Sequence, residues 1–313
     1  MQYWENSHAA AQNVAVLLFD GFSNHCLANT VEPMRAVNRL TGRQLFEWQF
    51  VSLDGAVVSS SSGLSVTPHS AIGGVQGDCL IVMPSYGFRA HGGGGTHRAL
   101  RAAAQRFDQV IGMDTGSWLL AEAGLLDGYQ ATIHWEELTA FAERFPEVEV
   151  LRERYVMDHD RITCSGAMAA FDLILHLIGR DLGQALAVEV AQLFMMRDSA
   201  RSHSGGATPA GRLVNRALAV MQENLEHPLT IAQVAARAGA TQKTLEHRMR
   251  RELGAVPAAV YRRLRLNLVR KLVEETDLSV AEIALRAGYA SPAAMTRAFR
   301  EAFGTTPRAL RQG

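Results

Sequence analysis

Asp114 occupies the position in this sequence from which chemistry is most readily expected. It lies in the stretch IGMDTGSWLLAEAGLLDG (111–128), where a short apolar run typical of a strand gives way to a helical pattern. A tight strand–turn–helix bend lifts one side chain clear of the backbone and points a helix N-terminus at it, as in enzymes that hold a nucleophile there. The residues therefore predict either an enzyme with an acidic nucleophile or an enzyme-like fold that binds a ligand.

Aromatic side chains in the same half of the chain favour the binding alternative. Those that could surround Asp114 are Phe22, Tyr86, Trp118 and Trp135. A carboxylate facing such rings attracts ammonium groups by cation–π interaction, at roughly 0.5 to 2 kcal/mol per ring. Each ring taken alone is better explained by packing in a core. Taken together with Asp114, the four rings predict a pocket for a small cationic metabolite.

The segments that must position Asp114 alternate between two patterns. Apolar or alternating runs predict strands over 14–20, 46–55, 79–85, 109–114 and 161–166, and helical periodicity predicts helices over 27–40, 96–107, 117–123, 135–145 and 167–178. This alternation predicts an α/β fold with a flavodoxin-like parallel sheet sandwiched between helices. Ligands of such folds bind at the carboxyl ends of strands, where Asp20, Ser85 and Asp114 fall.

Composition divides the chain into two domains. Its 313 residues exceed what one core usually serves. We predict a ligand-sensing domain over 10–197, a Gly/Ser-rich linker over 198–211 and an all-α domain over 212–313. The chain has no net charge, but from residue 208 onward 17 Lys/Arg face 9 Asp/Glu, an excess of eight positive charges. A basic tail on an acidic domain indicates that only the tail binds a polyanion.

The basic tail contains an internal repeat. Residues 229–257 (LTIAQVAARAGATQKTLEHRMRRELGAVP) are echoed by 278–307 (LSVAEIALRAGYASPAAMTRAFREAFGTTP), each with a helix, a glycine turn and a second helix. This pattern predicts two helix-turn-helix units. The segment 258–275 between them reads as one helix of about 27 Å, at 1.5 Å per residue. Such a spacer allows two recognition helices to approach successive major grooves, about 34 Å apart.

Helical periodicity also sorts the residues of each second helix into an inner and an outer face. Leu245 and Met249 face inward in the first unit, as do Met295, Phe299 and Phe303 in the second. The predicted DNA-facing residues are Lys243, Glu246, His247 and Arg250, then Ala293, Thr296, Arg297 and Arg300. An ordinary helical bundle with a solvated basic face is the alternative, and the repeat with its turn glycines favours double-stranded DNA as the partner.

Cysteine content and hydropathy bear on the compartment. Three cysteines without CxxC or CxxH spacing predict a reducing cytoplasm rather than a disulfide framework or a metal site. We expect no cofactor. No apolar run approaches the roughly 20 residues of a membrane span, and the N-terminus lacks a signal pattern. We therefore expect a cytoplasmic protein without a membrane partner.

The tail resembles the AraC/XylS family of transcription regulators. The likeness covers about a hundred residues, through IAQVAARAGATQKTLEHRMRRELG, RLRL (263–266) and SVAEIALRAGYASPAAMTRAFREAFGTTP. The resemblance implies base reading by the outer residues named above, chiefly Lys243, Glu246 and His247. One departure is that Pro292, Ala293 and Ala294 are poor hydrogen-bonding residues. We expect the second unit to depend more on phosphate contacts.

The N-terminal part resembles the class I glutamine-amidotransferase-like superfamily, which includes PfpI-type proteases and the sensor half of GlxA-type regulators. The likeness rests on VAVLLFDGFS, VEPMRAVNRL, GLLDGYQATIHW and the turn at Asp114. Active members of that superfamily carry a cysteine at the position of Asp114 and an assisting carboxylate at that of Cys26. A helix N-terminus activates a thiolate but should stabilise a carboxylate and weaken it as a base. We therefore predict a protein that is not an enzyme, the alternative being an amidase or hydrolase that uses Asp114 or Cys164.

The stretch DTGSWLLAEAGLLDGYQATIHWEEL resembles regulators of carnitine and glycine betaine catabolism. This likeness implies a methylated amine as effector, with any carboxylate met by His134, Arg89 or the amides of Thr115 and Gly116. The expected protein is a ligand-responsive transcription regulator, an activator of a catabolic operon, that forms a homodimer and has RNA polymerase as a candidate partner. A DNA-binding protein whose N-terminal domain only dimerises remains a rival.

Overall fold

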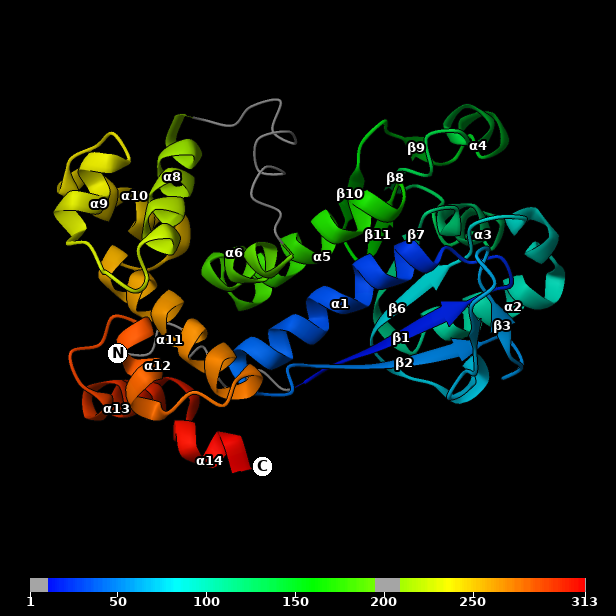
Figure 1. Ribbon diagram of the computed structural model, residues 1–313. Coiled ribbons are helices and arrows are strands. Elements are labelled where there is room, and N and C mark those ends of the chain that lie inside the picture. The colour runs from blue at the N-terminus through cyan, green and yellow to red at the C-terminus, as the bar shows by residue number, and fades with distance from the viewer. Residues whose placement is uncertain (1–10, 195–208, 313) are drawn as a thin grey trace. The chain divides into compact units, whose positions relative to one another are not determined.

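The computed structural model describes residues 11–194 and 209–312 of the chain (Figure 1). These residues divide into two compact units. One unit extends to residue 177, apart from 40–42, and the other comprises 40–42 and the described residues from 178 onward. Of the predicted linker 198–211, residues 198–208 lie outside the described part, and helix α8 begins at Pro209.

The first unit is built on one sheet of mainly parallel strands. In spatial order its strands are β10 (Tyr155–Asp158), β11 (Arg161–Cys164), β7 (Phe107–Met113), β6 (Gly77–Met83), β1 (Gln12–Leu18), β2 (Phe46–Ser52) and β5 (Ser70–Ala71). Within this sheet, only β10 runs antiparallel to its neighbour among the described residues. The five longer parallel strands follow the order 2-1-3-4-5 when counted along the chain, which is the flavodoxin-like order. The predicted fold class is confirmed.

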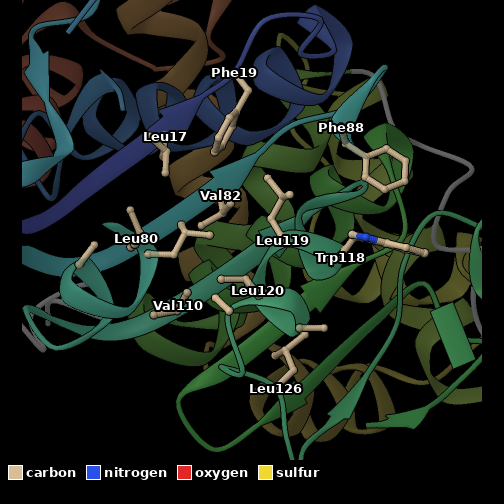
Figure 2. Close-up of a cluster of buried hydrophobic side chains, with 14 of the residues drawn as sticks. Leu17, Phe19, Leu80, Val82, Phe88, Val110, Trp118, Leu119, Leu120 and Leu126 are labelled. Carbon is tan, nitrogen blue, oxygen red and sulfur yellow. The ribbon is translucent and has the colours of Figure 1, made fainter. Parts of the chain in front are cut away.

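Alternation along the central strands explains why the sheet is covered on both faces. In β1, Ala15 and Leu17 belong to the cluster shown in Figure 2, whereas Val14 and Val16 point to the opposite face. The helices of this unit are α1 (Asn24–Thr41), α2 (Gly94–Ala104), α3 (Gly116–Glu122), α4 (Leu138–Arg144) and the first part of α5 (Ala167–Leu182). Short elements complete it: β3 (Val58–Ser59), β4 (Ser65–Val66), η1 (Ile72–Gly74), η2 (Phe88–His91), β8 (Gln130–Ala131) and β9 (Glu149–Val150).

The second unit is helical throughout its described residues. Its helices are α6 (Gln184–Leu193), α8 (Pro209–Glu223), α9 (Ile231–Arg237), α10 (Gln242–Leu253), α11 (Pro257–Glu275), α12 (Val280–Arg286), α13 (Pro292–Phe303) and α14 (Pro307–Gln312). Helices α9 and α12 begin with capping boxes at Thr230 and Ser279. After each of them the chain turns at a glycine in the left-handed region, Gly239 or Gly288. Both predicted helix-turn-helix units are therefore present.

Two separate cores stabilise the two helix-turn-helix units. The first includes Leu245 and Met249 of α10, and the partly buried Val188 of α6 packs against it. The second includes Met295 and Phe299 of α13 together with residues of α11 and α12. No helix among the described residues has the length and apolar character needed to span a bilayer.

Candidate ligand pocket and nucleic-acid interface

A cavity of about 510 Å³ lies at the carboxyl edge of the sheet. Four strands, β1, β6, β7 and β11, lead into the segments that line it. The lining residues are Ser23, Asn24, His25, Ala28, Ser61, Ser62, Tyr86, Asp114, His134 and Ala167. The volume lies within the range of about 300 to 1,000 Å³ that is usual for small-molecule sites. Eight of its ten lining residues carry polar side chains, which can pair with a charged ligand.

Asp114 stands on a strained turn directly after β7. Its backbone is left-handed, with φ 59°, which is unusual for a residue other than glycine. The turn is close-packed, because a Cβ on Gly116 would lie 2.2 Å from the carbonyl oxygen of Val82. Ser85 donates a hydrogen bond from Oγ to Oδ2 of Asp114 at 2.8 Å, and the backbone N–H of His134 donates to its carbonyl oxygen at 3.2 Å. The carboxyl group is thus fixed at the cavity wall.

Burial raises the pKa of Asp114 above the ordinary value of 3.8. The hydrogen bond from Ser85 and the nearby His134 both act in the opposite direction and do not outweigh the loss of solvent. The helix N-terminus was expected to stabilise the ionised form, whereas burial of Asp114, which is only 9% exposed, moves its pKa in the opposite direction. A group of this kind is stabilised in its charged form when a cation arrives beside it.

The two thiols near Asp114 are unsuited to nucleophilic chemistry. Cys26 and Cys164 are fully buried. Burial raises the pKa of Cys164 to about 12 and that of Cys26 well above its ordinary value. Because the thiolate is the reactive form, a pKa raised in this way disfavours both side chains as nucleophiles near neutral pH. Within the described residues no cluster of three His, Cys, Asp or Glu side chains is arranged to hold a metal ion.

The predicted cage of four rings is not assembled around Asp114. Tyr86, 70% exposed, is the ring that lines the cavity. Trp118 is 6% exposed and points into the hydrophobic cluster between the sheet and its helices (Figure 2). Phe22 is fully buried, and Trp135 is 67% exposed and outside the cavity wall. The apolar face of helix α3 packs against the sheet, and Trp118 lies on that face, so its ring is buried in the core.

Of the residues predicted to contact a ligand carboxylate, only some lie in the wall of the cavity. His134 lines the cavity, whereas Arg89 forms an ion pair with Glu137 and lies over the ring of Trp118, at 4.5 Å from its centroid. Thr115 is buried and donates its hydroxyl to the carbonyl of Ser85 at 3.0 Å. Thr115 and Gly116 therefore shape the turn and are absent from the cavity wall.

Sequence reasoning missed the polar residues at the start of α1. Ser23, Asn24 and His25 line the cavity at the start of an 18-residue helix, where Ser23 Oγ accepts a hydrogen bond from the backbone N–H of Cys26 at 3.2 Å. Ala167, at the start of α5, also lines the cavity, and its carbonyl oxygen accepts a hydrogen bond from Asn29 of α1 at 2.9 Å. The available signal was the polar triplet SNH, a few residues after the first strand of an α/β sheet and at the start of its first helix.

The outer face of α10 has the predicted character. Leu245 and Met249 are fully buried, while Lys243, His247 and Arg250 are exposed. Glu246 is half-buried and accepts a hydrogen bond from the side chain of Gln242 at 2.8 Å. The helix thus presents a row of polar and basic side chains opposite its core face.

Helix α13 repeats this arrangement. Met295 and Phe299 are fully buried, and Phe303 is partly buried. On the opposite face Ala293, Arg297 and Arg300 are exposed and Thr296 is half-buried. Ser291 caps the helix through a hydrogen bond accepted from the backbone N–H of Ala294 at 3.2 Å. Two basic helices of this kind, each in a helix-turn-helix unit, form a candidate surface for the DNA major groove.

A ligand-sized cavity in an α/β unit and two helix-turn-helix units define the class of a ligand-responsive transcription regulator. Residues 12–180 match the DJ-1/PfpI family, and residues 234–313 match a helix-turn-helix domain. The chain belongs to the DJ-1/PfpI family and joins that domain to an AraC-type DNA-binding domain, as GlxA-like transcription regulators do. The predicted family is confirmed.

Several curated relatives match nearly the whole chain. The HTH-type transcriptional regulators GbdR and CdhR of Pseudomonas aeruginosa are 34% and 36% identical to it, over 96% and 95% of this chain and 84% and 90% of their own. GlxA of Rhizobium meliloti is 32% identical over 96% of both chains. All three are regulators, so the prediction of a DNA-binding regulator rather than an enzyme is confirmed.

Solved structures agree for the first unit. A crystal structure of an AraC family transcriptional regulator from Pseudomonas putida matches with a TM-score of 0.51 at 25% identity, over 58% of this chain and 99% of that one. A ThiJ/PfpI family protein from Pseudomonas syringae matches with a TM-score of 0.51 at 22% identity, over 65% and 80% of the two chains. The second likeness shows the fold alone.

Proposed function

We propose that this regulator senses a small zwitterion that carries a methylated ammonium group, such as glycine betaine or carnitine, and activates a catabolic operon in response. The observation that supports this most directly is the buried carboxyl group of Asp114 in the wall of a polar cavity. The resemblance of 114–138 to regulators of carnitine and glycine betaine catabolism supports the same class of effector.

The ammonium end of such an effector pairs with Asp114. A cation beside a poorly solvated carboxylate offsets the cost of ionising it, so binding and ionisation favour each other. Tyr86 adds one aromatic face for the methyl groups. Because a methylated ammonium group lacks strong hydrogen-bond donors, recognition by charge and ring surface suits it well.

The carboxylate end of the effector is held at the start of α1. Positive potential from the helix N-terminus and donors from Asn24 and His25 lie on the same cavity wall. Asp114 and these groups carry opposite potentials and share one cavity, so they select a zwitterion over a simple cation. The contacts first expected from Arg89 and Gly116 have no part in this arrangement.

The response is proposed to pass along the chain. Helix α5 begins at Ala167 in the cavity wall, and its residues from Ile178 onward belong to the second unit. An effector that favours one position of α5 changes how the DNA-binding unit is presented to its operator. We propose that the protein acts in the cytoplasm as a homodimer on double-stranded operator DNA and recruits RNA polymerase there.

Calorimetric titration of the full-length chain tests the effector. Glycine betaine and carnitine should bind, and choline, which lacks the carboxylate, should bind at least tenfold more weakly. 3,3-Dimethylbutanoate, in which carbon replaces the ammonium nitrogen, should not bind. Equal binding of glycine betaine and 3,3-dimethylbutanoate would contradict the role of Asp114. Consumption of an amide or ester by the chain, lost in Asp114→Ala, would instead support the hydrolase alternative.

A further inference from the structure

The two helix-turn-helix units differ by one residue in their turns. Helices α9 and α10 are separated by residues 238–241, whereas α12 and α13 are separated by residues 287–291. Corresponding residues before the turn are equally far apart in sequence: Thr230 and Ser279 differ by 49 positions, as do Gly239 and Gly288. The first residues of the recognition helices α10 and α13 differ by 50 positions. The second recognition helix is therefore reached by a longer turn.

An arginine from the preceding long helix holds each of these turns. Arg216 of α8 donates from Nε to the carbonyl oxygen of Ala238 at 2.9 Å, and Arg265 of α11 donates from Nε to that of Ala287 at 2.8 Å. The donor and acceptor residues are 22 positions apart in both units. The arginines thus occupy equivalent positions in the duplication.

The acceptors lie where a backbone needs outside partners. The last carbonyl groups of an α-helix have no intrahelical donor, and a cation near them is also favoured by the helix dipole. Ala238 and Ala287 are the C-terminal caps of α9 and α12, directly before the left-handed glycine. Fixing that carbonyl fixes the direction in which the turn leaves the helix.

Arg265 makes additional contacts that match its longer turn. It donates a second hydrogen bond, from Nη2 to the carbonyl oxygen of Gly288 at 2.6 Å. Its guanidinium carbon also lies 4.2 Å from the ring centroid of Tyr289. In the first unit Ala240 follows Gly239, where the second has Tyr289, and offers no ring. The extra residue of the second turn is therefore accompanied by an extra set of contacts to the same arginine.

We propose that Arg216 and Arg265 are positioning residues for DNA recognition, each of which aims one recognition helix, α10 or α13, through the turn before it. They act through the backbone of the turn and not through contact with DNA. Since the two units have separate cores, loss of one arginine should disturb one recognition helix and leave the other in place.

Hydroxyl-radical footprinting with the full-length chain tests this. The probe is a DNA duplex selected from a random library by the unmodified protein, with two protected patches about 34 Å apart. Arg216→Met should remove protection at the patch bound by α10, and Arg265→Met at the other, each with a loss of overall affinity of about tenfold or more. Base-pair changes within the affected patch should lose their effect on affinity, while those in the other patch keep theirs.

Lysine substitutions separate positioning from general stability. An ammonium group can replace the single hydrogen bond of Arg216 but cannot give two directed bonds and stack on a ring. Arg216→Lys should therefore regain most of the lost protection, and Arg265→Lys should regain little. This comparison decides the matter even if a methionine variant does not fold. Equal loss of both patches in each variant, equal recovery by both lysines, or an unchanged footprint would overturn the proposal.

Discussion

At the scale of single residues, the carboxyl group of Asp114 is buried where its ionised form is disfavoured unless a cation lies beside it. Its pKa is raised mainly by burial, so the folded chain is less stable when this carboxyl group is ionised. We predict that Asp114→Asn abolishes binding of glycine betaine and leaves the ligand-free chain as stable as the original, or more stable, at pH 7. Calorimetry and thermal unfolding measure the two effects. Asp108→Asn, which changes an exposed carboxylate on the same strand, should leave binding unchanged.

The pH dependence of stability follows from the same shift. Because the pKa of Asp114 is higher in the folded chain than its ordinary value of 3.8, the folded state binds this proton more tightly. The resulting stability is present at low pH and is lost as the pH rises through the raised value. The melting temperature of Asp114→Asn minus that of the unmodified chain should therefore grow as the pH rises from 4 towards neutrality. A difference that shrinks over this range would contradict the assigned shift.

Gly116 is needed for close packing at the turn. A Cβ there would lie 2.2 Å from the carbonyl oxygen of Val82, which is backbone and cannot move alone. We predict that Gly116→Ala lowers the free energy of unfolding of the first unit by about 3 kcal/mol, the upper part of the usual range for overpacking. Gly95→Ala, an exposed position with open space around it, serves as control and should not destabilise. Urea unfolding followed by circular dichroism measures both.

The place of Asp114 could be predicted from sequence, whereas its neighbours could not. A strand followed by DTG and a helix fixes where the turn lies. Which rings face that turn depends on how α3 rotates over the sheet, and Trp118 is drawn into the core by the apolar face of that helix. The polar residues Asn24 and His25 were overlooked because exposed polar residues at a helix start are common.

At the scale of elements, a buried ion pair joins α6 to α11 within the second unit. Glu189 of α6 accepts a hydrogen bond from Asn267 at 2.8 Å, and its carboxylate lies 3.6 Å from Nε of Arg263. Both charged side chains are 9% exposed. Burial raises the pKa of Glu189, although its two partners act against this shift. The charged form of Glu189 therefore depends on its contacts with Arg263 and Asn267.

Removing Glu189 should release α6. We predict that Glu189→Ala weakens the docking of this helix by about 3 kcal/mol, because Arg263 loses its buried counter-charge. Hydrogen exchange of the α6 amides, measured on the full-length chain, should then accelerate by about a hundredfold. Glu189→Gln retains an acceptor for Asn267 and should show a smaller change. Unchanged exchange in Glu189→Ala would show that the pair does not hold α6.

The long elements were predictable, and the short ones were not. The five parallel strands and α1, α2, α10, α11 and α13 follow strong periodicity, so their existence and their inner faces agree with the sequence. Helix α4 begins at Leu138 rather than at Trp135, since residues 135–137 form a turn that precedes the helix. The two-residue strands β3, β4, β8 and β9 carry too few residues for a pattern, and their pairing is set by tertiary contacts.

At the scale of the whole molecule, the excess of positive charge lies in the C-terminal part, which carries the helix-turn-helix units. The excess of eight positive charges from residue 208 onward predicts affinity that falls steeply with salt concentration. Arg250 and Arg300 are exposed at equivalent positions of α10 and α13. We predict that replacing either by alanine reduces the slope of log affinity against log salt by about 1. Fluorescence anisotropy at several salt concentrations measures the slope, and an unchanged slope in both variants would place these arginines away from the phosphates.

If the effector controls DNA binding, adding it must change the affinity of the chain for its selected DNA duplex. Binding of the full-length chain to its selected DNA duplex is measured by anisotropy with and without glycine betaine or carnitine, for the unmodified chain and for Asp114→Asn. One of these effectors should change the affinity of the unmodified chain at least fivefold, the lower end of usual allosteric coupling. Asp114→Asn should bind the duplex and show no response. A response retained in Asp114→Asn, or none in the unmodified chain with either compound, would contradict the account.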